Sequence, residues 1–199
     1  FRGFRRVRET FPWTSPSGGL VGRRETTFSQ ADHTRGQIEQ QETMAAAFGG
    51  AFPTVSKETY TWATQLDGPR TQVYLAEKKS EVFDIETGGG ATQCRLDRNV
   101  APDVYGRVGT RCTLPCGTSN PGSCSDNVVG QVTTVSVWAN PSYTPGTQPA
   151  VRERPASVTV SYVKPGGGTE TLSQQNFTYA WPAGNVLTAT TVGDATTGG

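Results

Sequence analysis

With 199 residues, the chain is long enough for one large domain or two small ones. Only 18% of its residues are charged and the formal net charge is +1, so it lacks the basic excess of proteins that bind phosphate backbones. No segment approaches the roughly 20 consecutive apolar residues of a membrane span. We therefore expect neither a nucleic-acid partner nor membrane insertion.

The composition favours strands over helices. Glycine (24) and proline (13) are abundant, and threonine and serine fill much of the remaining sequence. β-Branched threonines suit strands, while clusters of Gly, Pro, Asn and Ser turn the chain between them. A helical bundle would contain more Leu, Ala, Glu and Lys. The composition predicts a mainly β, extracellular protein.

The first 22 residues show neither helical nor strand periodicity, and prolines and glycines interrupt them repeatedly. They predict an irregular basic and aromatic arm that docks on a neighbouring subunit. The residues expected at that interface are Phe1, Phe4, Arg5, Arg6, Phe11 and Trp13. In the alternative interpretation, the arginines of this arm pair with carboxylates of their own domain or of a neighbour. Binding to an anionic glycan, a membrane surface or nucleic acid is a third possibility for such a segment.

Residues 29–48 predict one short helix, because glutamates, glutamines and three consecutive alanines favour helix. Gly49-Gly50 would end it. The side chains that can share one face of this helix are Ile38, Met44, Ala45 and Phe48.

Strand patterns dominate after Pro53 and are separated by glycine-containing turns such as Asp67-Gly68. A short strand is also compatible with residues 23–28. The other predicted strands cover 57–64, 71–76, 81–85, 91–96, 105–114, 128–138, 156–163, 169–181 and 185–192. Residues 140–155 form a proline-rich connector that is unsuited to the middle of a sheet. Such spacing suits a sandwich or a barrel.

All four cysteines lie within a short stretch rich in turn residues, which predicts two disulfides and an oxidising compartment. They are Cys94, Cys112, Cys116 and Cys124. Of three possible pairings we favour Cys94–Cys112 and Cys116–Cys124, because the second bond would close a small loop that has no hydrophobic side chain. A zinc site is the alternative, although the tight CxxC pair typical of zinc clusters is missing and the lone His33 is distant.

Several of these features occur together between residues 71 and 181. They are Cys94, the run Arg111-Cys112-Thr113-Leu114-Pro115, the alternating valines that follow, and the closing Phe177-Thr178-Tyr179. This pattern resembles the IPT/TIG family of immunoglobulin-like domains, which occurs in plexins and transcription factors. The resemblance implies an immunoglobulin-like β-sandwich used for adhesion, spacing and assembly, without catalytic residues.

The expected domain organisation has three parts. Residues 1–52 hold the arm and the helix, residues 53–192 form the immunoglobulin-like sandwich, and residues 193–199 are a Gly/Thr linker or tail. The chain starts with Phe1 and ends in Gly198-Gly199, so we expect a processed product or a piece of a longer polypeptide.

No catalytic constellation is evident, and we expect neither an enzyme nor a cofactor or metal site. A Ser/His/Asp arrangement would have to use His33. The carboxylate pairs Asp84/Glu86 and Asp97/Asp103 can serve as acid and base or as calcium ligands, but charged loop residues are usually just solvated.

Exposed tryptophans can stack on sugar rings, although a buried core tryptophan is the more ordinary explanation in a sandwich. The four tryptophans are Trp13, Trp62, Trp138 and Trp181. A carbohydrate-binding module with glycan ligands is therefore the main alternative function. A virion or appendage subunit with incidental cysteines is another.

The sequence also contains one usable N-glycosylation site, at Asn176 in Asn176-Phe177-Thr178. Together with the disulfides, it predicts an extracellular or cell-surface location. We expect a non-enzymatic structural or adhesive module of a larger cell-surface or filamentous assembly, whose partners are other protein subunits in a homo- or hetero-assembly.

Overall fold

The computed structural model describes most of the chain, and every element in the described part is a strand. The described residues are 3–15, 18–45, 52–67, 69–84, 90–103, 106–116, 124–125, 127–138, 154–180 and 185–192. For 13–15, 18–21, 67, 70, 179–180 and 185–192 only the backbone is described. The protein is therefore all-β over these ranges, as the composition predicted.

The chain divides into two compact units, Phe1–Asp97 and Arg98–Gly199. The expected boundary after residue 52 falls inside the first unit, and the expected tail, residues 193–199, lies outside the described residues.

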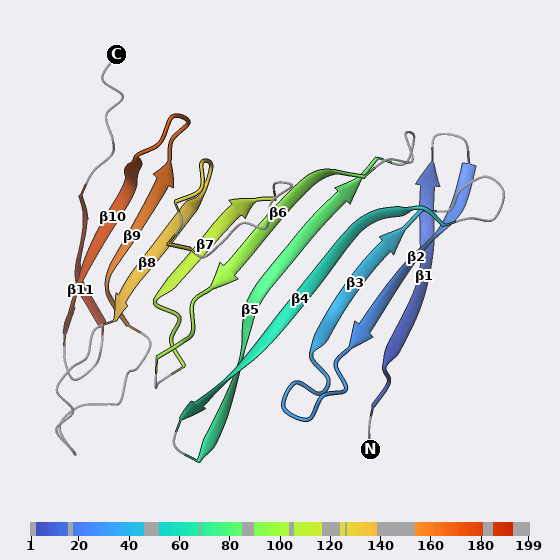
Figure 1. The fold of residues 1–199 in the computed structure, drawn as a ribbon, viewed down its shortest axis with the longest axis horizontal. Coiled ribbons are helices and arrows are strands. Elements are labelled where there is room, and N and C mark those ends of the chain that lie inside the picture. The colour runs from blue at the N-terminus through green and yellow to red at the C-terminus, as the bar shows by residue number, and fades with distance from the viewer. Residues whose placement is uncertain are drawn as a thin grey trace. The chain divides into compact units, whose positions relative to one another are not determined.

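In the first unit the strands follow one another in chain order, each paired with the next (Figure 1). They are β1 (Arg6–Ser15), β2 (Gly18–Phe28), β3 (Ile38–Met44), β4 (Thr54–Asp67), β5 (Arg70–Phe83) and β6 (Ala91–Asn99), whose last residues cross the boundary between the units. The pairings from β1 to β5 are antiparallel. The pairing of β4 with β5 runs to Asp67↔Arg70, and Gly68 of the predicted Asp67-Gly68 turn lies outside the described residues. The strands predicted over 71–76 and 81–85 form the single strand β5.

In the second unit the order again follows the chain (Figure 1). The strands are β7 (Thr110–Pro115), β8 (Val132–Trp138), β9 (Pro155–Val163), β10 (Thr169–Ala180) and β11 (Asn185–Val192). All four pairings between successive strands are antiparallel. The turn before β10 contains Gly166, Gly167 and Gly168, each with a positive φ that favours glycine.

The helix predicted over residues 29–48 is wrong. Residues 31–36 form a turn, and residues 38–44 form β3, which pairs with β2 on one side and β4 on the other. The backbone N–H and C=O groups on both sides of β3 therefore form hydrogen bonds to neighbouring strands. These hydrogen bonds outweigh a preference for helix of a few tenths of a kcal/mol per residue. Phe48 lies outside the described residues.

The irregular arm is also wrong, because β1 and β2 form a hairpin with unbroken register from Arg6↔Thr27 to Ser15↔Gly18. Pro12 is tolerated because β1 is the first strand of the described sheet, where prolines occur. The Phe11 ring lies directly over Gly22, where a Cβ would come within 2.5 Å of it. The strand pattern was missed in the sequence because β1 keeps no regular alternation of apolar and polar residues and contains Pro12.

The described strands do not confirm the predicted two-layer sandwich. Few hydrophobic side chains of the described residues are buried: Met44, Ala45 and Leu96 in the first unit, and Cys112, Leu114 and Val163 in the second. The remaining residues of most strands are half-buried or exposed. Over the described ranges, each unit thus has a small core beside a large area of accessible sheet.

Candidate functional site

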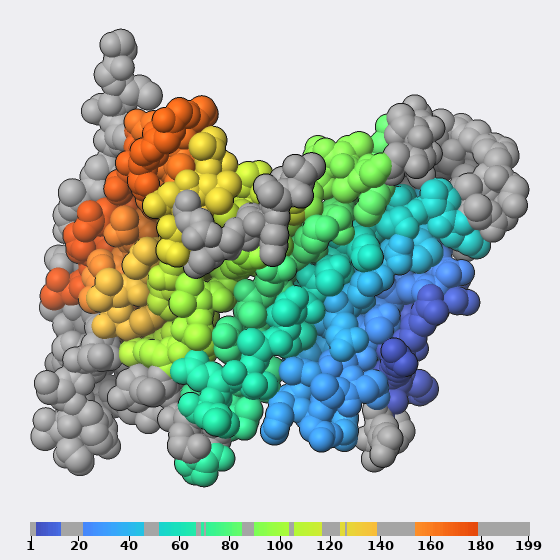
Figure 2. All heavy atoms as spheres, viewed as in Figure 1, coloured from blue at the N-terminus to red at the C-terminus, as the bar shows by residue number. Residues whose placement is uncertain are grey.

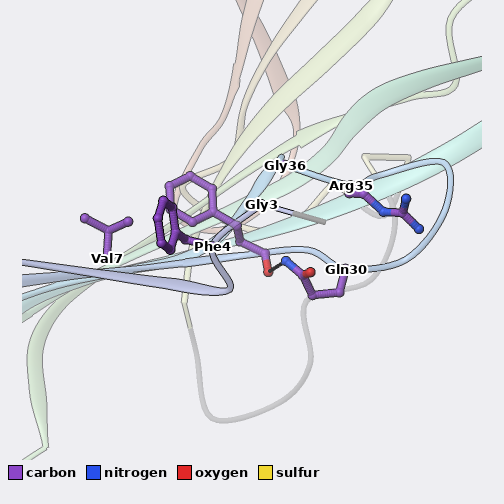
Figure 3. Close-up of a pocket in the computed structure, with 7 residues that line it drawn as sticks. Gly3, Phe4, Val7, Gln30, Arg35 and Gly36 are labelled. Carbon is purple, nitrogen blue, oxygen red and sulfur yellow. Dashed lines mark hydrogen bonds between the residues drawn. The ribbon is translucent and has the colours of Figure 1, made fainter. Parts of the chain in front are cut away.

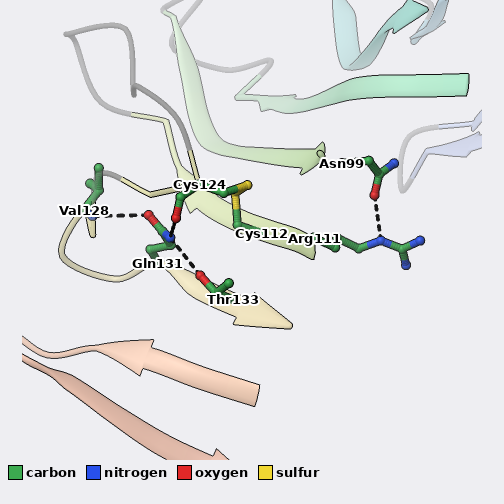
Figure 4. Close-up of a disulfide and its surroundings, with 7 residues drawn as sticks. All are labelled: Asn99, Arg111, Cys112, Cys124, Val128, Gln131 and Thr133. Atoms are coloured by element: carbon green, nitrogen blue, oxygen red, sulfur yellow. Dashed lines mark hydrogen bonds between the residues drawn. A yellow bond between two sulfur atoms is a disulfide. The ribbon is translucent and has the colours of Figure 1, made fainter. Parts of the chain in front are cut away.

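The disulfide region holds the most buried part of the second unit. Cys112 on β7 is bonded to Cys124, with Cα atoms 5.6 Å apart (Figure 4). Cys94 and Cys116 are disulfide-bonded as well, so no cysteine is free to bind zinc. Two disulfides were correctly predicted, but the favoured pairing was wrong. Sequence distance favoured the shortest loop, whereas β7 places Cys112 within the core and Cys116 beyond the end of the strand.

Gln131 fixes the loop that contains Cys124. Its side chain is fully buried and donates hydrogen bonds from Nε2 to the Cys124 carbonyl (2.6 Å) and to Thr133 Oγ1 (2.8 Å). Its Oε1 accepts a hydrogen bond from the Val128 amide at 3.2 Å (Figure 4). A buried amide with all these partners acts as a clamp. Sequence reasoning missed it, because a glutamine between Gly130 and Val132 carries no burial signal.

A second buried polar group, Glu25 on β2, holds the hairpin of the first unit. Glu25 is only 5% exposed and forms ion pairs with Arg6, Arg8 and Arg23; the Arg8 Nε lies 2.8 Å from Glu25 Oε1. Arg8 is directly opposite Glu25 in the register. The alternative interpretation of the basic segment, in which its arginines pair with a carboxylate of their own domain, is thus confirmed for Arg6 and Arg8.

The other expected interface residues lie in different surroundings. Phe4 is 74% exposed and lines an apolar hollow of 330 Å³ beside Val7 and Phe28 (Figure 3). The Arg5 carbonyl accepts a hydrogen bond from the Phe28 amide at 2.8 Å. The half-buried Phe11 ring lies beneath the Arg24 guanidinium, 5.9 Å away. Phe1 and the side chain of Trp13 lie outside the described residues. The predicted role of these residues at an interface stays a prediction.

On β4 and β5, three polar side chains form a cluster. The Tyr60 hydroxyl donates to Glu58 at 2.5 Å, and Lys78 Nζ lies 2.7 Å from Glu58 and 5.4 Å from the centre of the Tyr60 ring. Burial acts to raise the pKa of Glu58, but the hydrogen bonds from Lys78 and Tyr60 outweigh it and lower the pKa below its usual 4.5. The hydrogen bond to Glu58 raises the pKa of Lys78, although burial opposes it. A nucleophilic lysine needs a lowered pKa, so this arrangement suits an ion pair.

The candidate carboxylates for acid–base chemistry interact with different arginines rather than with one another. His33 is exposed in the turn before β3, and its neighbour Asp32 pairs with Arg35 at 2.6 Å. Asp97 accepts a hydrogen bond from Arg95 Nε at 3.0 Å. Asp103 binds Arg107. Among the described residues, no group of three His, Cys, Asp or Glu side chains is placed to hold a metal.

The glycosylation site lies in the middle of β10. Asn176 is opposite Ser157 of β9 and Thr190 of β11, and its side chain is exposed. The asparagine is therefore accessible on the folded sheet. The disulfides fit the same oxidising environment.

The second unit also contains a polar hollow of 490 Å³ beside β7 and β8. Its lining includes Arg107, Arg111, Thr134, Ser136 and Trp138. Trp138 was considered as a sugar platform from the sequence, but the two arginines were not, because nothing in the sequence places them beside Trp138. The side chain of Trp62, by contrast, is half-buried and its Nε1 donates to the Ile38 carbonyl at 2.7 Å.

Comparison with known proteins does not assign the chain to a family: neither a protein-family model nor a curated protein matches it. In the part of the chain that the structure describes, no helix is long and apolar enough to cross a membrane.

Proposed function

We propose that the chain is a non-enzymatic structural or adhesive module of a larger extracellular assembly, in which a partner layer covers one face of its sheet. With that layer added, the second unit acquires the two-layer arrangement of an immunoglobulin-like sandwich. The resemblance to IPT/TIG domains supports the same role.

The observation that carries this proposal is that β9 is only half-buried. This strand lies between β8 and β10, yet none of its residues from Pro155 to Tyr162 is buried, and only Val163 at its end is. In a sandwich, alternate residues of a central strand face the core and are removed from water. A sheet must bury one face against another element to be stable.

The two faces of β9 differ in chemistry. Because successive side chains alternate, Val158, Val160 and Tyr162 share one face, while Ser157, Thr159 and Ser161 share the other. Asn176 is opposite Ser157 and therefore belongs to the face rich in hydroxyl groups. The apolar face is the one suited to a partner layer, and a glycan on Asn176 would project from the opposite side.

The first unit presents accessible sheet as well. The residues of β4 from Thr54 to Tyr60 are all half-buried, although β4 lies between β3 and β5. Figure 2 shows the side chains of β3, β4 and β5 at the surface on the face that is seen. Such accessible central strands are typical of a subunit that packs against a partner.

The test compares two substitutions on opposite faces of β9, Val160→Asp and Thr159→Asp, in a tagged chain in extracts of its native source. We expect the unaltered chain and the Thr159→Asp variant to sediment in a complex, and the Val160→Asp variant to sediment as a monomer. A charge on the apolar face would have to be desolvated on assembly, which the hydroxyl face avoids. Thermal unfolding of each purified variant checks that it is folded.

Two results would refute the proposal. One is an unaltered chain that sediments at its monomer mass in the extract. The other is a Val160→Asp variant that remains in the complex. The extracellular location is tested separately by intact mass before and after reduction with alkylation, and before and after deglycosylation. Four thiols that alkylate without reduction would contradict it.

A further inference from the structure

The polar hollow of the second unit is built around a rigid arginine. Arg107 is only 7% exposed, and its guanidinium lies 5.5 Å from the centre of the Trp138 ring. Asp103 holds it with hydrogen bonds of 2.8 Å to Nε and 2.6 Å to Nη2. The Arg107 amide donates a further hydrogen bond to Asp103, and Gly106 has a φ of +81°. The charge of Arg107 is thus matched by Asp103.

Arg111 supplies a charge that is not matched in this way. Its side chain is exposed, and its Nε donates to the neutral amide oxygen of Asn99 at 2.8 Å (Figure 4). Among the described residues, no carboxylate pairs with the Arg111 guanidinium. Its planar fork of N–H groups suits bidentate binding of a carboxylate. Within the part of the chain that is described, the lining of the hollow, with Asp103 included, therefore carries one net positive charge.

Hydroxyl groups and an aromatic ring complete the lining. Thr134 is directly opposite Arg111, and Thr134, Ser136 and Trp138 recur at every second position of β8, so they project to the same side of the sheet. A hydroxyl both donates and accepts hydrogen bonds, as the hydroxyls of a sugar require. A flat indole ring matches the apolar face of a pyranose. The volume of 490 Å³ lies within the range of small-ligand sites.

We propose that this hollow binds an acidic sugar of the hexuronate class, with its carboxylate on Arg111, its hydroxyls on Thr134 and Ser136, and its ring beside Trp138. A neutral sugar would leave the Arg111 charge unused, and an inorganic anion would leave the hydroxyl groups and the indole without a partner. Because Ser136 is opposite Val158, the hollow lies on the apolar face of the sheet, at its β7 margin. The site goes beyond the proposed assembly role and needs no partner chain.

Calorimetric titration of the purified full chain tests the site, with D-glucuronate and D-galacturonate as ligands and D-glucose and D-galactose as their neutral counterparts. We expect the uronates to bind at least about tenfold more tightly than the neutral sugars, since a charge-assisted bond to the guanidinium is lost in the latter. Arg111→Gln should weaken uronate binding by about 10- to 100-fold. Ser136→Ala should weaken both classes of sugar to a similar degree.

The matched control is Arg95→Gln. Arg95 is also an exposed arginine on a strand, with a side chain 63% exposed and an ion pair to Asp97. Its substitution should leave uronate binding unchanged. The proposal is overturned if neither uronate binds the unaltered chain, if neutral sugars bind equally well, or if Arg111→Gln keeps the original affinity. Because the isolated chain is titrated, these results do not depend on whether it assembles.

Discussion

Gln131→Ala provides a sharp test of how the second unit is held together. The substitution removes three side-chain hydrogen bonds from a fully buried position. Two of the groups that lose a partner are main-chain groups, the Cys124 carbonyl and the Val128 amide. At about 1 kcal/mol net for each hydrogen bond, the loss amounts to about 3 kcal/mol of the free energy of unfolding.

The corresponding shift in melting temperature is large enough to measure by calorimetry. For a unit of about 100 residues, each 1 kcal/mol lowers Tm by about 4–8 °C, so about 3 kcal/mol lowers it by about 12–24 °C. Gln175→Ala is the control, since Gln175 is an exposed glutamine on β10. Its substitution should change the free energy of unfolding by no more than about 0.5 kcal/mol, as is usual for surface substitutions. Tm should therefore shift only slightly.

A second variant separates the hydrogen bonds from the shape of the side chain. Gln131→Glu keeps the size and the acceptor for Val128, but it replaces the donor that faces the Cys124 carbonyl with an oxygen. We expect destabilisation at neutral pH and partial recovery at low pH, where the protonated acid can donate one bond again. If Gln131→Ala melts within the range of Gln175→Ala, the clamp does not contribute to stability and the reasoning is wrong.

Three further outcomes are expected in the two units. Glu25→Gln should destabilise the first unit by about 2 kcal/mol in urea unfolding, because three arginines lose a buried carboxylate. Glu9→Gln, at an exposed position of β1, should have little effect, and equal effects of the two substitutions would contradict the role of the cluster. Because the pKa of Glu58 is below its usual 4.5 in the folded protein, its stabilising contribution is complete above that value and is lost as the pH falls through the folded pKa. Glu58→Gln should therefore flatten the acid limb of a plot of Tm against pH, and parallel curves would speak against it. Replacing both Cys112 and Cys124 by alanine removes a disulfide that joins residues 12 apart, and should lower the free energy of unfolding by about 3 kcal/mol. The urea midpoint under non-reducing conditions measures this loss, and an unchanged midpoint would mean that the loop is held without the disulfide.

Three strands of the second unit could be read from the sequence with good boundaries, whereas β7 and β8 begin later than the predicted segments 105–114 and 128–138. The predicted segments 156–163, 169–181 and 185–192 correspond to β9, β10 and β11. In these segments β-branched residues alternate and glycine-rich turns separate them, so local preference and pairing agree.

The first unit could not be predicted in the same way. Residues 38–44 have a helical composition, but they lie between two strands whose backbone groups pair with theirs. On β1, Arg8 is stabilised by an ion pair with Glu25, which lies on another strand. In both cases the deciding interaction joins residues distant in sequence. Patterns within a short window do not contain that information.

For the candidate sites the division is similar. Composition and motifs by themselves determined the β class, the presence of disulfides and the sequon at Asn176, because these depend on residue types and short spacings. Only the tertiary structure decided that Cys112 bonds Cys124, that Gln131 clamps their loop, and that Arg107, Arg111 and Trp138 line one hollow. Disulfide pairing and binding geometry depend on which strands lie side by side and in which register, and that register is set by the packing of the whole unit.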